Sequence, residues 1–233
     1  MSKQTAGQRV GRPRRSGIAG GAPREEIVAA AARLFAEIGY ADTTVSAIAR
    51  EAGLGQSSLY YWFANKEAIL QALIDKNRES LETARQLVDD PADAAARLYR
   101  IIYDDVVQMC SAPLDFYELE RVSRAQPEEF ADFFADYREL ETLMARVIEQ
   151  GVAAGEFVAV EPGPATTAAL SLSEGLQYRF RQGEAGAERM REFAHLSAST
   201  TVGALVRDRE RVAAARAGVG GGFTHPHPLP KLK

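Results

Sequence analysis

Apolar residues recur at steps of three and four along most of the chain, and this spacing limits the fold more than any other feature. In the first such run Ile27, Ala31, Leu34 and Ile38 would share one face of a helix. Ala, Leu, Glu and Arg dominate, β-branched runs are rare, and no segment has a convincing strand pattern. We therefore expect an all-α protein, with a first helix over residues 24–38.

Composition excludes several classes of protein. The chain has 233 residues, of which 46% are hydrophobic and 26% are charged, so it is neither disordered by composition nor apolar enough for a membrane protein. Its one cysteine, Cys110, excludes an internal disulfide and a cysteine-based metal cluster. No stretch reaches about 18 uncharged apolar residues, and no apolar segment follows the basic N-terminus. We expect a soluble, cytoplasmic protein with no membrane partner.

Charge is distributed unevenly. Residues 1–66 contain nine Lys or Arg and five acidic residues, a net charge of +4, whereas the remaining residues carry −8. A basic end attached to an acidic body favours a polyanionic partner such as nucleic acid, although surface solvation alone would also explain it.

Segments rich in proline and glycine, together with the charge pattern, divide the chain into four predicted regions. Residues 1–22 read as a flexible basic arm, 23–66 as a compact N-terminal domain, 67–217 as a larger helical domain, and 218–233 as a flexible tail. In the larger domain the spacing predicts one long helix over 67–89, another from Leu98 to Met109, and further helices over 127–151, 165–181 and 186–210. Residues 161–164 read as a loop because they contain Pro162, Gly163 and Pro164.

Residues 43–63 have the pattern of a helix-turn-helix motif. Thr43 and Thr44 are suited to cap a short helix that ends at Gly53, where the turn requires a left-handed residue. Ala49 is small where two helices cross closely. A third helix, over 55–63, would follow. Ile48, Leu54 and Leu59 would point inward.

The third helix leaves polar and aromatic side chains for the outside. Its outward residues are Gln56, Ser57, Ser58, Tyr61 and Trp62, which suit hydrogen bonding to base edges and contact with thymine methyl groups. Lys66 would lie where an ammonium meets a phosphate. The competing interpretation is that these aromatic residues belong to the core. The helical spacing places Leu59 and Phe63 inward and does not decide whether Tyr60 lies in the core or on the surface.

Several residues of this region occur in a characteristic order. They are Phe35, Gly39-Tyr40, Thr43-Thr44, Ile48-Ala49, Ala52-Gly53, Leu59-Tyr60, Phe63 and Lys66-Glu67. Over residues 24–70 this order resembles the DNA-binding domain of TetR-family transcriptional regulators. Gly55 and Ser57 depart from the usual Ser and Gly, and Trp62 replaces a frequent His; these departures affect the choice of operator, the DNA site that is bound.

The resemblance implies an N-terminal three-helix DNA-binding domain and a C-terminal helical ligand-binding and dimerisation domain. It places the third helix in the major groove, with Gln56, Ser57, Ser58 and Tyr61 at or near bases. Thr44, Tyr60 and Lys66 would contact phosphates, and Ser46 would reach a base in some members. Trp62 belongs to the same expected surface.

The basic arm suggests a further DNA contact by its own chemistry. Arg12, Arg14 and Arg15 lie in a narrow cationic segment that suits an A·T-rich minor groove. The competing interpretation is a charge run that only raises the rate of association.

The resemblance also implies that the last two long helices pair with those of a second subunit. Small and apolar residues there suit close helix crossings, although ordinary core packing would give the same pattern. The predicted homodimer interface comprises Leu170, Gly175, Leu176, Phe193, Leu196, Thr200 and Ala204.

Aromatic residues concentrate between residues 99 and 137, and their collective excess predicts a pocket for an unidentified, mainly apolar or aromatic small molecule. For each residue taken singly, a filled core is the competing interpretation. Tyrosine hydroxyls and Gln177 or Arg181 would orient the ligand. The predicted ligand-binding residues are Tyr99, Tyr103, Met109, Phe116, Tyr117, Phe134, Tyr137 and Gln177.

These features predict a ligand-responsive repressor rather than an enzyme. It would bind a palindromic double-stranded DNA operator as a dimer and be released when a ligand moves the long helix over 67–89. One alternative is a helical-bundle enzyme, since Glu192 and His195 have Glu-x-x-His spacing, but a second copy is absent and we expect no metal or cofactor. The other alternative is an architectural DNA-binding protein.

Overall fold

The structure, a computed structural model, describes residues 23–75, 78–114, 116–183 and 186–219. Within these ranges the chain forms eleven α-helices and no strand, apart from one isolated antiparallel bridge between Phe157 and Val206. The all-α prediction is confirmed. The predicted arm, and all of the predicted tail except Gly218 and Val219, lie outside the described residues.

The N-terminal part is the predicted helix-turn-helix unit, made of α1 (Pro23–Ile38), α2 (Val45–Glu51) and α3 (Gln56–Tyr60). The Thr44 side chain accepts a hydrogen bond from the Ala47 amide and so caps α2. Gly39 has φ 83° and Gly53 has φ 68°, the left-handed conformation that both helix ends require. The third helix ends at Tyr60, three residues earlier than predicted.

The long helix predicted over 67–89 is wrong, because the chain forms two helices there. These are α4 (Lys66–Ile74) and α5 (Glu79–Leu87). Residue 78 has φ −113° and ψ 20°, outside the helical region. The sequence between Ile74 and Leu81 contains only polar residues, so no apolar side chain anchors an intervening turn in the core.

The middle of the chain contains one helix that the sequence did not predict. The central helix α6 (Ala94–Ser111) is capped by Asp93, as the predicted run around Leu98 to Met109 suggested. It is followed by α7 (Phe116–Ala125) and α8 (Ala131–Ala153). The sequence predicts only breaks at Pro113 and Pro127, and the ten residues of α7 lie between them.

Two more boundaries differ from prediction near the C-terminus. The helix α9 (Pro162–Arg181) begins inside the predicted loop, because proline fits the first helical turn. The predicted helix over 186–210 is divided into α10 (Ala187–Leu205) and α11 (Glu210–Val219). Between them Val206 is extended, with ψ 143°, and its neighbours pair with the segment at Phe157.

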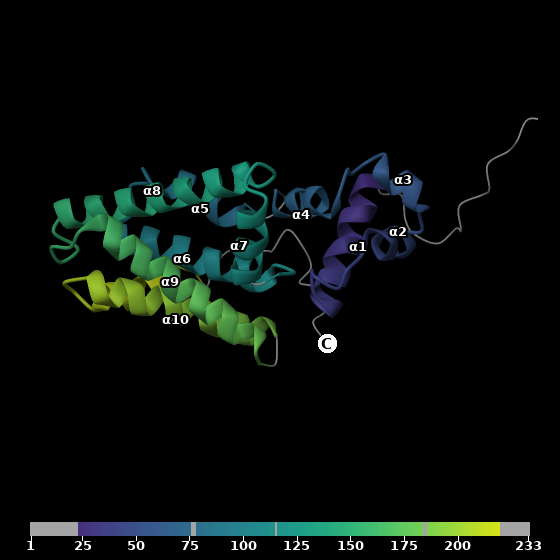
Figure 1. Ribbon diagram of the computed structural model, residues 1–233. Coiled ribbons are helices and arrows are strands. Elements are labelled where there is room, and N and C mark those ends of the chain that lie inside the picture. The colour runs from purple at the N-terminus through teal and green to yellow at the C-terminus, as the bar shows by residue number, and fades with distance from the viewer. Residues whose placement is uncertain (1–22, 76–77, 115, 184–185, 220–233) are drawn as a thin grey trace, which may run out of the picture.

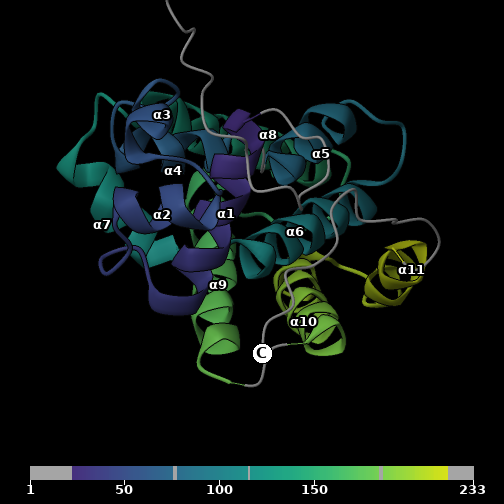
Figure 2. The same cartoon turned by 90° about the vertical axis from the view of Figure 1, so that its right-hand side faces the viewer.

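Two apolar clusters hold the molecule together. One joins α1–α4 and also includes Leu114, Val122 and Phe130; the other surrounds α6 and contains buried residues from α5, α8, α9, α10 and α11. Figure 1 shows α1–α3 at one end of the molecule, the α6, α8, α9 and α10 layer at the other, and α4 between them. Figure 2 shows α11 beside α6 and α10. None of the described helices is long and apolar enough to cross a membrane.

Candidate nucleic-acid interface and ligand cavity

The α3 helix has one buried side and one open side. Leu59 and Phe63 are buried, as their spacing predicted, and they pack in the cluster of α1–α4. Gln56, Ser57 and Ser58 are exposed on the opposite side. The hydrogen-bonding side chains of this helix are therefore available to a partner.

Aromatic residues continue this open surface past the end of α3. Tyr61 is 81% exposed and Trp62 is 40% exposed, and their rings meet edge to face with centroids 5.3 Å apart. Tyr60 is 48% exposed. This residue, for which the helical spacing did not decide between core and surface, is therefore not part of the core. Large apolar side chains seldom stay exposed together without a partner.

The α2 helix contributes two polar residues to the same surface. The Ser46 hydroxyl donates a hydrogen bond to Oε1 of Gln56 over 3.0 Å, which leaves the Gln56 NH₂ group to donate elsewhere. Thr44 is exposed, and its hydroxyl retains its own O–H while the oxygen caps α2. We name Thr44, Ser46, Gln56, Ser57, Ser58, Tyr60, Tyr61 and Trp62 the recognition surface.

The Lys66 side chain makes contacts within the domain, whereas the sequence predicted that it would contact a phosphate. Its ammonium donates to the backbone carbonyl oxygens of Tyr40 and Thr43, over 2.7 and 3.0 Å, and lies 4.0 Å from the centre of the Tyr40 ring. Burial lowers its pKa. These contacts fix the loop before α2 to the start of α4, so Lys66 has a structural task inside the domain. The predicted arm contacts, Arg12, Arg14 and Arg15, lie outside the described residues.

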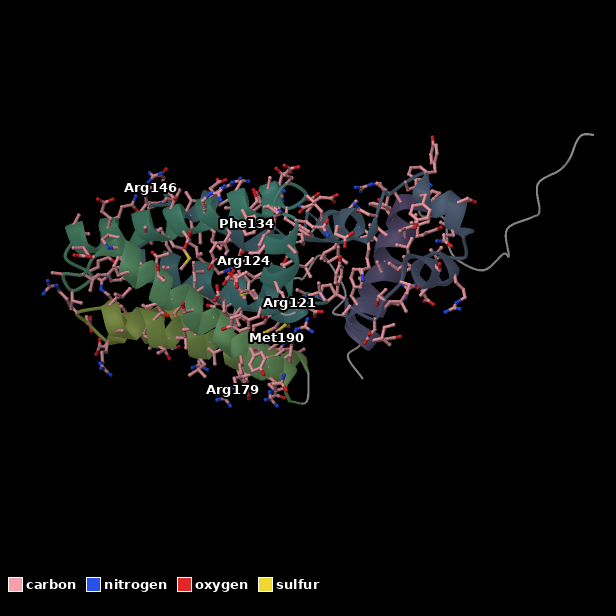
Figure 3. The ribbon with its side chains drawn as sticks, viewed as in Figure 1. Arg121, Arg124, Phe134, Arg146, Arg179 and Met190 are labelled. Atoms are coloured by element: carbon pink, nitrogen blue, oxygen red, sulfur yellow. The ribbon has the colours of Figure 1, made fainter. Side chains whose placement is uncertain are left out.

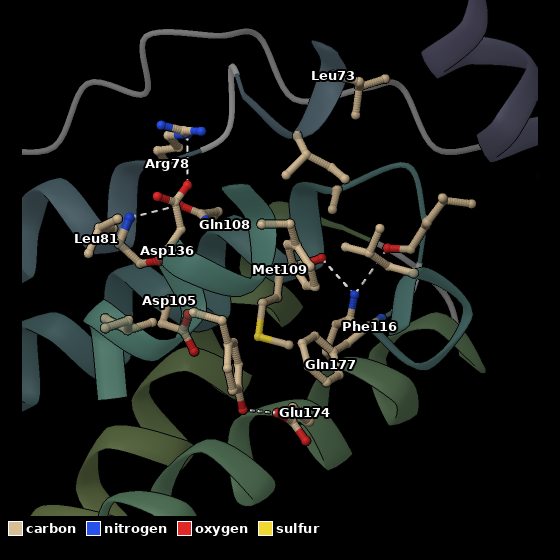
Figure 4. A pocket seen from close by; sticks show the side chains of 18 of the residues that line it. Leu73, Arg78, Leu81, Asp105, Gln108, Met109, Phe116, Asp136, Glu174 and Gln177 are labelled. Atoms are coloured by element: carbon tan, nitrogen blue, oxygen red, sulfur yellow. Dashed lines mark hydrogen bonds and ion pairs between the residues drawn. The ribbon is translucent and has the colours of Figure 1, made fainter. Parts of the chain in front are cut away.

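A cavity of about 120 Å³ lies between α4 and the larger helical layer. Leu70, Leu73 and Ile74 of α4 form one wall, and side chains of α5–α9, together with Arg78 and residues 112–114 between the helices, form the rest. Figure 4 shows Leu73 and Arg78 on one side of this cavity and Glu174 and Gln177 of α9 on the other. Four residues of the predicted ligand pocket line it: Met109, Phe116, Tyr137 and Gln177.

The other four predicted ligand residues do not line the cavity. Tyr99 is fully buried between α6 and α10, where its hydroxyl contacts His195 and Ser199, and Tyr103 is buried against His195. Tyr117 is exposed and its ring packs on Tyr178. Phe134, labelled in Figure 3, packs in the α1–α4 cluster. The pocket prediction is wrong for these four residues, because each lies on a helix face turned away from the cavity.

Polar contacts fix the cavity wall. Gln177 accepts a hydrogen bond from the Phe116 amide and donates to the Met109 carbonyl, over 2.8 and 2.9 Å. Its amide therefore holds α7 and the end of α6 rather than pointing freely at a ligand. Tyr137 donates to Glu174 over 2.7 Å, and burial raises the pKa of both groups.

The acidic residues that line the cavity, and Phe133, were not among the predicted ligand-binding residues. Asp105, Asp136 and Glu174 all line the cavity. A signal existed for Asp105, because Leu98, Ile102, Asp105 and Met109 follow helical spacing, which places a carboxyl group in the middle of an apolar stripe. Burial raises the pKa of Asp105 to about 7, and Glu174 adds to the effect.

The α9–α10 surface carries most of the predicted subunit interface. Leu196 is 51% exposed, and Thr200 and Ala204 follow at steps of four on the same open face of α10. Leu176 and Phe193 line a groove beside them, and Gly175 is partly exposed. The prediction is wrong for Leu170, which is buried and lines the cavity because it lies on the inner face of α9. Arg179, labelled in Figure 3, projects from this helix and lines the groove.

The Glu192 and His195 pair does not form part of a larger ligand cluster in the described part of the chain. Nδ1 of His195 lies 2.9 Å from the Tyr99 hydroxyl, and burial lowers the His195 pKa. Among the described residues, no group of three or more His, Cys, Asp or Glu side chains is arranged to hold a metal ion. His195 therefore joins α10 to α6.

The segment that carries the recognition surface is similar to a known family of proteins. Residues 27–73 match the family model described as "Bacterial regulatory proteins, tetR family". The A-factor receptor protein of Streptomyces griseus is 43% identical over 56 residues, which is 24% of this chain and 20% of that protein. The transcriptional repressor KstR2 of Mycobacterium tuberculosis is 29% identical over 137 residues, 58% of this chain and 68% of that protein.

The similarity to a solved structure extends further along the chain. The crystal structure of AmtR from Mycobacterium smegmatis superimposes with a TM-score of 0.68 and 28% identity, and the match covers 90% of this chain and 98% of AmtR. In contrast, the sequence matches span only 20% to 42% of the first curated relatives. The structural similarity therefore spans most of the chain, whereas the family model matches only residues 27–73.

Proposed function

Since the chain belongs to the TetR family of bacterial transcriptional regulators, we propose that it is a ligand-responsive repressor that binds a palindromic operator as a homodimer. Two of its relatives are named a repressor and a receptor, which supports both parts of this proposal. Its own operator and effector are proposals that rest on the geometry of this chain.

The observation that carries the proposal is the open side of α3. Gln56, Ser57 and Ser58 are exposed while Leu59 anchors the helix from behind, so the helix presents polar groups on a rigid support. Amide and hydroxyl groups on an exposed helix suit the donors and acceptors of the major groove. The Ser46 contact orients the Gln56 amide before any partner arrives.

A dimer explains how so short a helix obtains useful affinity. In two-fold helix-turn-helix proteins, two recognition helices read half-sites about one helical turn apart. The exposed stripe of Leu196, Thr200 and Ala204 on α10 is the surface we assign to the partner subunit. A palindromic operator follows from this symmetry.

The cavity offers a physical connection between a ligand and the recognition surface. Leu70 lines the cavity and also belongs to the apolar cluster of α1–α4. A ligand that fills the cavity would press on α4, and α4 is joined to the start of α2 through Lys66. A ligand that prefers a different position of α4 would shift the dimer away from the DNA-binding arrangement.

The test begins with selection of binding sites from random duplex DNA by the full-length protein. We expect an inverted repeat with half-site centres about 10 base pairs, or one helical turn, apart. In competition against a scrambled duplex, Gln56→Ala and Tyr61→Ala should each reduce the preference by about tenfold or more, since a good base contact contributes about 1–3 kcal/mol.

The matched control is Gln86→Ala, which truncates an exposed glutamine on α5, away from the recognition surface. It should keep the wild-type preference. Circular dichroism should show that all three variants remain folded. Unchanged preference in both α3 variants, or no enriched sequence in the selection, would show that this surface does not read DNA.

A further inference from the structure

The ligand cavity is mainly apolar, yet acidic side chains also line it. Among the described residues that line it, three are acidic, Asp105, Asp136 and Glu174, and one is basic, Arg78. The remaining lining side chains are mostly aliphatic or aromatic. Acidic groups in such a place require either a compensating charge or the uptake of a proton.

Asp105 is the most deeply placed of the three. It lies on α6, is only 5% exposed, and has a hydrogen bond with Ser80 of α5. Its Oδ2 atom is buried and has no hydrogen-bond partner among the described residues. An unpartnered carboxylate oxygen in a cavity wall is unusual, because buried polar atoms are nearly always hydrogen-bonded.

Glu174 adds negative charge to the same region. It lies on α9 and accepts the Tyr137 hydroxyl over 2.7 Å, a contact drawn in Figure 4. Its charge also raises the pKa of Asp105, so the two carboxyl groups interact across the cavity. Ionisation of both is unfavourable unless a positive charge lies between them.

Arg78 is engaged with other carboxylates. Its Nε lies 2.8 Å from Oδ2 of Asp136, and its Nη2 lies 3.1 Å from Oδ1 of Asp75. The lining residues therefore provide one cation, and two carboxylates already surround it. Among the described residues, neither Asp105 nor Glu174 forms an ion pair with Arg78, the basic side chain of the cavity wall.

We propose that the effector is a small lipophilic cation, an amine on an aromatic or aliphatic body, whose ammonium group pairs with Asp105 in the field of Glu174. The inference rests on the proposed function, because it assigns the chemical class of the ligand for the same cavity. The ammonium would donate to Oδ2 of Asp105, and the apolar body would contact Phe116, Phe133 and Leu73.

The walls and size of the cavity favour this class over others. A volume of about 120 Å³ is somewhat below the roughly 150 Å³ of an engineered apolar cavity that binds benzene, so the cavity suits a small ligand of about one ring. A ligand with a carboxylate would bring a further negative charge beside Asp105 and Glu174. A neutral ligand would supply no counter-charge, so one of these two carboxyl groups would have to hold a proton.

The test compares three probes of similar size on the full-length protein without DNA. 2-Phenylethylamine carries the cation, 2-phenylethanol is its neutral analogue, and 3-phenylpropionate carries an anion. Calorimetric titration at pH 8 should show that the amine binds at least tenfold more tightly than the alcohol, and that the anion binds more weakly than either.

The variants identify the residue responsible. Asp105→Asn keeps the shape of the side chain and should bring the affinities of the amine and the alcohol to within threefold, without weakening the alcohol. Glu174→Gln should reduce the same preference by a smaller factor, and it provides an independent test if Asp105→Asn does not fold. Asp132→Asn removes an exposed carboxylate from α8 outside the cavity and should keep the wild-type preference.

Two results would overturn the inference. One is that wild-type protein binds the alcohol or the anion as tightly as the amine, or does not bind the amine at millimolar concentration. The other is that the amine preference persists in both Asp105→Asn and Glu174→Gln. Neither outcome touches DNA recognition, which the site selection measures without ligand, so failure of the ligand assignment is distinguishable from failure of the proposed function.

Discussion

Individual side chains differ in how much of their role the sequence reveals. Leu59 and Phe63 were correctly placed inward because helical spacing decides which side of a short helix is buried. Tyr99 and Tyr137 are both tyrosines in the aromatic-rich region, yet only Tyr137 lines the cavity. Aromatic density predicts that a region is packed, but the face that borders a cavity depends on the positions of neighbouring helices.

Asp105 supports a prediction about pH and stability. Its pKa is about 7 in the folded protein, above the ordinary value of 3.8. Between about pH 4 and 7 the folded state therefore holds a proton that the unfolded state has released, so this residue makes stability fall as the pH rises through that window. The effect is on the order of a few kcal/mol, since one pKa unit corresponds to about 1.4 kcal/mol.

The Asp105→Asn variant isolates this contribution. Groups that do not interact with Asp105 contribute equally in both proteins, so the comparison reports Asp105 together with its interaction with Glu174. Urea unfolding should give nearly equal stabilities at pH 4, and the variant should become progressively more stable than the wild type up to pH 8. A difference that does not change between pH 4 and 8 would mean that Asp105 titrates normally.

At the scale of elements, the sequence located most helices but not their ends. The α1, α2 and α6 helices were expected because capping residues and apolar spacing agree there. The long predicted helix over 67–89 failed because its apolar spacing pauses after Ile74. The α7 helix was missed because two prolines near its ends read as breaks, although neither lies inside it.

Close packing at the end of α8 gives a prediction for one element. A Cβ atom on Gly151 would lie 2.9 Å from Cβ of Ala94 and would also clash with the buried Phe157 ring. Gly151→Ala should therefore destabilise the protein by about 1–3 kcal/mol despite the better helix propensity of alanine. Denaturant unfolding measures the change.

Gly163→Ala is the matched control, because Gly163 also lies in a helix and nothing lies within 4 Å of its added Cβ. It should leave stability unchanged or raise it by up to about 1 kcal/mol. Equal effects of the two substitutions would show that α6, α8 and the Phe157 segment are not in close contact.

At the scale of the whole molecule, α4 connects the cavity to the N-terminal helix-turn-helix unit. Its residues line the cavity and also belong to the N-terminal apolar cluster. The family resemblance in the sequence names the residues of the recognition surface, and their contact with DNA stays a prediction. The cavity was only partly predictable, because its residues come from six helices whose packing no local pattern specifies.

The proposed dimer gives a prediction at the same scale. Leu196→Glu would place a charge in the centre of the assigned interface on both subunits, and should weaken dimerisation by more than about 2 kcal/mol, or about thirtyfold. Sedimentation should show more monomer, and operator affinity should fall with it. Thr142→Glu, which adds a charge to an exposed position of α8, should leave the dimer intact. Normal dimerisation of Leu196→Glu would place the interface elsewhere.

The most direct test of the recognition surface is photo-crosslinking to the selected operator from a benzophenone amino acid in place of Tyr61. Tyr178 on α9 is the matched position, because it is an exposed tyrosine far along the chain from α3. If α3 reads the operator, position 61 crosslinks to a base within a half-site and position 178 does not. DNA-bound protein that crosslinks from position 178 but not from position 61 would contradict this role of α3.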